Sequence, residues 1–98
     1  YLYRNSDTEL YMLWSTQCGK GNTCRYVEAC ALSDNGEIDG NWLHCEQFVF
    51  DRDGGHGMLF HDLHDQLRFI MHAPNCDPLE RPVIFNVQIK NGCLSIVE

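Results

Sequence analysis

An internal repeat is the sequence feature that most constrains the fold. When YLYRNSDTELYMLWS (1–15) is placed over MLFHDLHDQLRFIMH (58–72) without gaps, Leu2 falls on Leu59 and Leu10 falls on Leu67. Both copies read as strand, polar turn and strand, and further strand-like segments follow each copy. A repeat of this length, with about four strands per unit, favours β-propeller blades. The alternative is a chance similarity between two apolar hairpins.

Strand-like segments occupy most of the chain, and no segment has helical periodicity. The predicted strands cover residues 1–4, 10–15, 24–32, 43–50, 57–61, 67–72, 82–90 and 93–98. Asn91-Gly92 is the clearest hairpin turn between them. We therefore expect an all-β fold, a β-propeller fragment of about two four-stranded antiparallel blades. One blade is expected at about 1–50 and the second at about 51–98.

Length, charge and hydropathy limit the number of domains and the kinds of partner that this chain can have. A chain of 98 residues makes at most one small domain. The formal charge of −7, with only seven Lys and Arg, disfavours nucleic acid. No apolar run is long enough to span a membrane. Two blades alone would expose large apolar faces, so we expect the rest of a propeller as partner, from the same polypeptide or from other chains. The Tyr at position 1 fits a fragment of a longer protein.

Six cysteines leave three interpretations open. Cys30, Cys45 and Cys93 lie in or beside strand-like runs, where a free thiol serves as a small buried hydrophobe. Six cysteines also suit a framework of three disulfides, as in a small secreted domain. Zinc is the third interpretation, although no Cys-x-x-Cys pair is present. Free thiols slightly favour a cytoplasmic protein, but the localisation stays unknown.

The stretch DGGHGMLF (53–60) places His56 among glycines directly before a predicted strand. Glycine removes side-chain bulk and permits positive φ, so the backbone here can turn tightly or approach another group closely. The pattern indicates a placed imidazole. His61, His64 and His72 suggest a zinc cluster, but His56 and His61 are an odd number apart and point to opposite faces of a strand.

These segments together resemble glycoside hydrolase family 43. GGHGM, LRFIMHAPN and ERPVIFNV are similar to the C-terminal part of its members, and YLYRNSDTELYMLWS and ALSDNGEIDGNW match earlier segments in the same order. The resemblance implies a five-bladed β-propeller that hydrolyses arabinose- or xylose-containing plant polysaccharides with inversion. Asn41, where the family has Pro, and Cys76 depart from the family pattern.

The family's catalytic residues fall outside this chain. The resemblance implies a general-base Asp, a second Asp that tunes the acid, and a general-acid Glu, all upstream of Tyr1, so no catalytic residue is expected here. Four acidic residues surround the glycine motif, but acidic residues in turns are usually solvated or capping groups. They are Asp51, Asp53, Asp62 and Asp65.

His56 is the one residue whose role the resemblance carries over. The matching His lies near the propeller axis, beneath the sugar pocket, and contacts a bound ion such as calcium, largely through water, so the resemblance implies one calcium ion at the propeller axis with His56 in contact with it. Neutral imidazole is a poor sole anchor for that hard cation. The other interpretations are a hydrogen-bonded structural His and, least of all, a catalytic one. Trp14 and Trp42 are expected in the blade core, with stacking on a sugar as the alternative.

Two functions from different classes follow. In the first, the chain is the C-terminal part of an inverting glycoside hydrolase that binds a carbohydrate substrate and is inactive alone, because the catalytic carboxylates lie upstream. In the second, it is a non-catalytic half-propeller that binds glycans or assembles with copies of itself. The substrate-binding residues cannot be named from the sequence.

Overall fold

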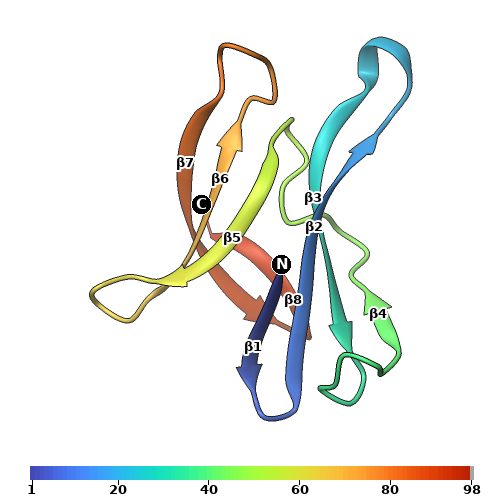
Figure 1. Cartoon of the computed structure of the whole chain (residues 1–98), viewed down its shortest axis with the longest axis vertical. Helices are drawn as coiled ribbons and strands as arrows, with labels where there is room; N and C mark the ends of the chain where they lie inside the picture. Colours follow the sequence, from blue (N-terminus) through green and yellow to red (C-terminus); the bar gives the residue numbers. More distant parts are fainter. Residues whose placement is uncertain (98) are drawn as a thin grey trace.

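The protein consists of two four-stranded antiparallel sheets, as seen in a computed structural model that describes residues 1–97 without the side chain of Thr23 (Figure 1). The first sheet contains β1 (Leu2–Ser6), β2 (Glu9–Cys18), β3 (Arg25–Ser33) and β4 (Trp42–His44), and a 3₁₀ turn, η1 (Gly21–Thr23), precedes β3. The second contains β5 (Gly55–His61), β6 (Leu67–Ala73), β7 (Arg81–Lys90) and β8 (Cys93–Val97). In each sheet, every strand pairs with its neighbour in the chain.

The repeat seen in the sequence is also a repeat of strand register. Leu2 pairs with Met12 between β1 and β2, and Leu59 pairs with Phe69 at the equivalent place between β5 and β6. The next two pairs of each hairpin are equivalent in the same way.

The buried positions of the two hairpins are not equivalent, however. Tyr11 and Leu13 are buried in β2, whereas β6 buries Phe69 and Met71, the equivalents of Met12 and Trp14. Since register fixes which face each side chain occupies, the two hairpins turn opposite faces to the core between the sheets.

The residues in the turns determine where the hairpins form. Asn91 and Gly92 both have positive φ, 55° and 75°, as the two-residue turn of the predicted β7–β8 hairpin requires. The first hairpin differs slightly from the prediction, because β1 continues through Ser6 and only Asp7 and Thr8 form the turn. Glu98, the last residue of the predicted final strand, lies outside the described residues.

The predicted strand at 43–50 is wrong over most of its length. β4 ends at His44, and beyond it the chain touches the sheet again only through an isolated bridge between Phe50 and Glu28. Val49 and Phe50 are both buried. Both side chains pack in the core between the sheets. Because this packing places the segment away from the sheet edge, it does not continue β4.

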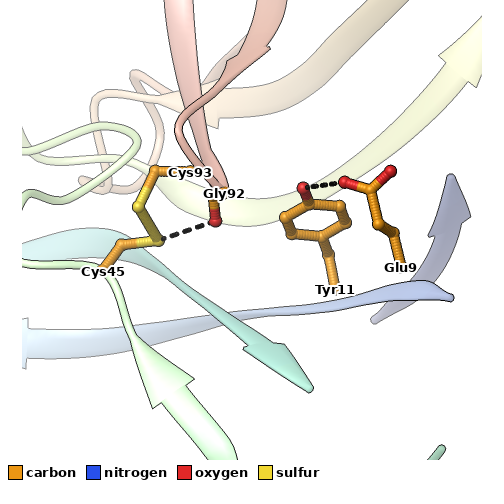
Figure 2. The surroundings of a disulfide bond; sticks show 5 residues. All are labelled: Glu9, Tyr11, Cys45, Gly92 and Cys93. Atoms are coloured by element: carbon orange, nitrogen blue, oxygen red, sulfur yellow. Dashed lines mark hydrogen bonds between the residues drawn. A yellow bond between two sulfur atoms is a disulfide. The ribbon is translucent and has the colours of Figure 1, made fainter. Parts of the chain in front are cut away.

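The core lies between the two sheets and draws on both. Leu13, Leu59 and Phe69 are among its fully buried members. β3 is buried at five successive residues, Val27–Ala31, so the side chains on both of its faces are covered. Tyr11 is fully buried, and its hydroxyl donates a 3.0 Å hydrogen bond to Glu9 (Figure 2). A buried hydroxyl without a partner would cost stability, so this pair keeps a polar group in the core.

A disulfide links the sheets. Cys45, just after β4, is joined to Cys93 at the start of β8, with 5.9 Å between their Cα atoms (Figure 2). The Gly92 carbonyl oxygen lies 3.7 Å from the Cys45 sulfur. The free-thiol prediction is therefore wrong for Cys45 and Cys93, and confirmed for buried Cys30. A framework of three disulfides is also wrong, since Cys18, Cys24 and Cys76 are free.

Candidate functional site

A pocket of about 510 Å³ opens where the two sheets meet. Its lining includes three aromatic side chains, those of Tyr1, Trp14 of β2 and Tyr26 of β3. Aromatic faces and neutral polar groups are the combination that a sugar, with one apolar face and a rim of hydroxyls, uses for binding. This composition makes the pocket the candidate binding site.

His56 also lines the pocket, from a bulge of β5. The register of β5 against β6 shifts between Gly55 and Met58, and His56 has a positive φ of 57°. The left-handed backbone thus falls on the histidine itself, whereas the sequence suggested the glycines. Histidine is one of the few non-glycine residues enriched in this region.

Close approach explains the glycines on both sides of His56. A Cβ on Gly55 would lie 2.8 Å from the Ser15 hydroxyl oxygen, and a Cβ on Gly57 would collide with the Phe69 ring. A side chain at position 55 would press on the first sheet, whereas one at position 57 would collide with β6 of its own sheet. The GGHG pattern therefore reflects close packing at the pocket, both between the sheets and within the second sheet.

A buried carboxylate lies behind the bulge. Glu28, in the middle of β3, is 1% exposed and lines the pocket. Its Oε1 accepts a 2.7 Å hydrogen bond from the Ser15 hydroxyl, and the Ser15 oxygen accepts a 2.6 Å hydrogen bond from the His56 amide. Burial raises the pKa of the Glu28 carboxyl, while the hydrogen bonds from Ser15 and from the Gly57 amide oppose that rise. A single polar chain thus runs from β3 through β2 to β5.

A second polar group lies at the pocket edge. The His72 Nε2 is 2.6 Å from the Asn75 side-chain oxygen, so Nε2 is the nitrogen that donates. Asp53 accepts hydrogen bonds from the backbone amides of Tyr26 and Asn75 at 3.1 and 3.3 Å. This network ties the loop before β5 to β3 and to the end of β6.

The other residues considered in the sequence lie elsewhere. Within the described residues no group of three or more His, Cys, Asp or Glu is placed to hold a metal, so the zinc interpretations of the histidines and cysteines find no site. Trp14 is half-buried at the pocket, with its ring edge-on to His44. Trp42 is half-buried in β4 and donates to the Ile38 carbonyl at 3.1 Å. Neither tryptophan belongs to the described buried core.

Glu28 and Ser15 were not found from the sequence, although one signal pointed to Glu28. It is a charged residue inside the apolar run YVEACAL, and a glutamate is almost never fully buried unless it is paired. No local pattern identifies the partner, because Ser15 comes from another strand. Asn75 gave no signal, being one of several polar residues in a loop.

The two sheets are similar to part of a larger protein of known structure. A crystal structure of an endo-arabinase from Bacteroides thetaiotaomicron VPI-5482 matches 94% of this chain with a TM-score of 0.83 and 37% sequence identity. The chain covers 31% of that protein. The two sheets are thus β-propeller blades, and they resemble a segment of an endo-arabinase. No protein-family model matches the chain, and no curated protein does. Within the described residues no helix is long and apolar enough to cross a membrane.

Proposed function

We propose that this chain is the C-terminal part of an inverting glycoside hydrolase of the family 43 type, acting on arabinose- or xylose-containing plant polysaccharides. The observation that carries the proposal is the similarity to the endo-arabinase at 37% identity over 94% of the chain. The pocket between the sheets supports it, since its lining combines aromatic side chains with polar groups. Arabinan is the first substrate to test.

The chain's own residues bind and orient substrate in this proposal. Inverting hydrolysis needs one carboxylic acid to protonate the leaving oxygen and one carboxylate to activate water on the opposite face of the sugar. Glu28 is the one carboxyl lining the pocket within the described residues, and its contacts to Ser15 and Gly57 occupy it. The acid and the base therefore come from the remaining blades.

The resemblance also implies a calcium ion at His56, and the residues on this chain do not by themselves fit one. Calcium takes six to eight oxygen ligands. Within the described residues, the His56 imidazole has no carboxylate cluster beside it. An ion at this place would depend on water and on oxygen atoms from other blades. No step of the proposed function depends on it.

The test uses the full-length gene product that contains this chain. It is incubated with linear arabinan, with an aryl arabinofuranoside and with an aryl xyloside, and the anomeric form of the first product is followed by proton NMR. We expect hydrolysis of arabinan or of one of the two glycosides with inversion. If none of the three is hydrolysed, the proposal is wrong, and the non-catalytic glycan-binding module becomes the working hypothesis.

A further inference from the structure

The backbone of His56 is held in a conformation that a glycine would adopt without strain. Its φ of 57° costs a non-glycine residue about 1 kcal/mol, yet glycines occupy the positions on either side and not this one. Strain of this kind persists only where the surrounding structure enforces it. Within the described residues, the His56 imidazole forms no hydrogen bond; it lines the pocket and interacts electrostatically with Glu28.

The first sheet enforces that conformation through two contacts. The Ser15 oxygen accepts from the His56 amide at 2.6 Å, which leaves the Ser15 proton to be donated to Glu28 at 2.7 Å. On the other side of His56, the Gly57 amide donates to the same carboxylate. The second carboxylate oxygen lies within 3.1 Å of where a Cβ on Gly57 would stand. Glu28 thus secures the bulge both before and after the histidine.

Glu28 accepts hydrogen bonds from two donors, the Ser15 hydroxyl and the Gly57 amide. An ionised carboxylate accepts hydrogen bonds at both oxygens, whereas the amide of a glutamine presents a donor at one end. If the oxygen of a glutamine at position 28 stayed on the Gly57 amide, its NH₂ group would face Ser15, whose oxygen would have to accept a second hydrogen bond and turn its own proton elsewhere. The glutamine therefore changes the hydrogen bonding of Ser15, the group that holds the His56 amide, although Glu and Gln have nearly the same shape.

We propose that Glu28 is a positioning residue, which acts through Ser15 and the Gly57 amide to fix the His56 imidazole in the pocket. The role in catalysis rests on the proposed function, because His56 matters to hydrolysis only if the pocket binds the sugar. The geometry itself does not depend on the reaction. A carboxylate on one blade thereby sets the site on the next.

The experiment compares Glu28→Gln and Ser15→Ala in the full-length gene product with ¹³C-labelled histidine. The ring signals of His56 are assigned with His56→Ala, and kcat/KM is measured on linear arabinan. We expect both variants to shift the His56 ring signals and to lower kcat/KM about tenfold. Ser33→Ala is the matched control, since it removes a buried serine hydroxyl of β3 that bonds Asn35 and Glu37 instead. It leaves the His56 signals unchanged.

Each outcome decides one of the two proposals. If both variants fold and the His56 signals match those of the wild type, the positioning role is wrong, whatever the activity. If the wild-type protein hydrolyses no arabinan but the signals shift, the positioning role stands and arabinan is not the substrate. If Glu28→Gln does not fold, Ser15→Ala, which removes a single hydroxyl, decides by the same signals.

Discussion

At the scale of single residues, the pocket combines the buried carboxylate of Glu28 with a histidine, His56, whose backbone is in the left-handed conformation. Each alone would cost stability, because burial disfavours the charged form of Glu28 and because L residues clash at positive φ. Together they offset part of that cost: the strained bulge brings the Gly57 amide to the carboxylate and the His56 amide to Ser15, and these contacts hold the bulge. The 2.6 Å from the His56 amide to Ser15 is short for a hydrogen bond, and the 2.7 Å from Ser15 to Glu28 is the usual distance between two oxygens.

His56→Gly is expected to stabilise the protein while removing a pocket side chain. Glycine adopts a φ of 57° without a Cβ clash, so the free energy of unfolding should rise by up to about 1 kcal/mol, less the entropy that glycine adds to the unfolded chain. Urea denaturation of the gene product measures it. The control is His61→Gly, which lies in the same strand without a positive φ and should destabilise by roughly 0.5–1 kcal/mol. Equal losses in both variants would mean that His56 carries no backbone strain.

The cysteines should differ sharply in reactivity. Burial raises the pKa of the Cys30 thiol to about 11, so at pH 8 almost none of it is the reactive thiolate, whereas Cys24 and Cys76 are exposed. Iodoacetamide followed by peptide mass spectrometry should label Cys24 and Cys76 in the native protein, and Cys30 only after unfolding. Cys45 and Cys93 should be labelled only after unfolding with a reductant. Labelling of native Cys30 as fast as Cys24 would contradict the packing described for β3.

At the scale of elements, the hairpins were predictable because their signals are local. Asn91-Gly92 supplies the positive φ values that a two-residue turn needs, and two short apolar runs on either side of the polar turn 62–66 indicate β5 and β6. The prediction of a strand at 43–50 was wrong because the apolar residues Val49 and Phe50 pack in the core between the sheets and do not form a strand. The same division holds for the site. The neighbouring glycines made His56 recognisable in the sequence. The Ser15–Glu28 pair was not predictable, because it joins two strands that meet only in the folded protein.

The β5–β6 turn should weaken in acid. Asp62 accepts hydrogen bonds from the backbone amides of Gln66 and His64, at 3.0 and 2.8 Å, and from Arg68 at 3.1 Å. These contacts, that of the Gln66 amide foremost, lower the pKa of Asp62 below its usual 3.8. Because the folded pKa is the lower one, the stabilisation is complete above pH 3.8 and is lost as the pH falls through the folded value.

Hydrogen exchange tests this turn directly. After correction for intrinsic rates, the protection of the His64 and Gln66 amides should fall as the pH drops below about 4. In Asp62→Ala both amides should exchange fast at every pH. Asp65→Asn, in the same turn, is the control and should keep the wild-type pH profile. Protection that stays constant from pH 6 to pH 2.5 in the wild type would show that Asp62 does not hold the turn.

At the scale of the whole molecule, the two sheets form a core but leave apolar side chains uncovered. Leu43 and Ile84 are 57% and 49% exposed, and they lie on different sheets. The matched endo-arabinase is about three times as long as this chain, which covers 31% of it. The sequence could predict this incompleteness, because two blades cannot close a ring when known propellers have four or more. The sequence could not predict which apolar side chains stay exposed to solvent, since that depends on how the two sheets pack.

Residues 1–98 expressed alone should therefore associate. Exposed apolar surface on blade faces favours contact with further copies, since burial of such surface is the main driving force for association. Size-exclusion chromatography with light scattering should give a mass above the 11.3 kDa of one chain, rising with concentration, and the sample should bind 8-anilinonaphthalene-1-sulfonate. The full-length gene product is the control: if it supplies the further blades proposed above, these faces are covered and it should bind little dye. A monodisperse 11.3 kDa species without dye binding would show that two blades suffice as a stable unit, and it would favour the stand-alone module over the enzyme segment.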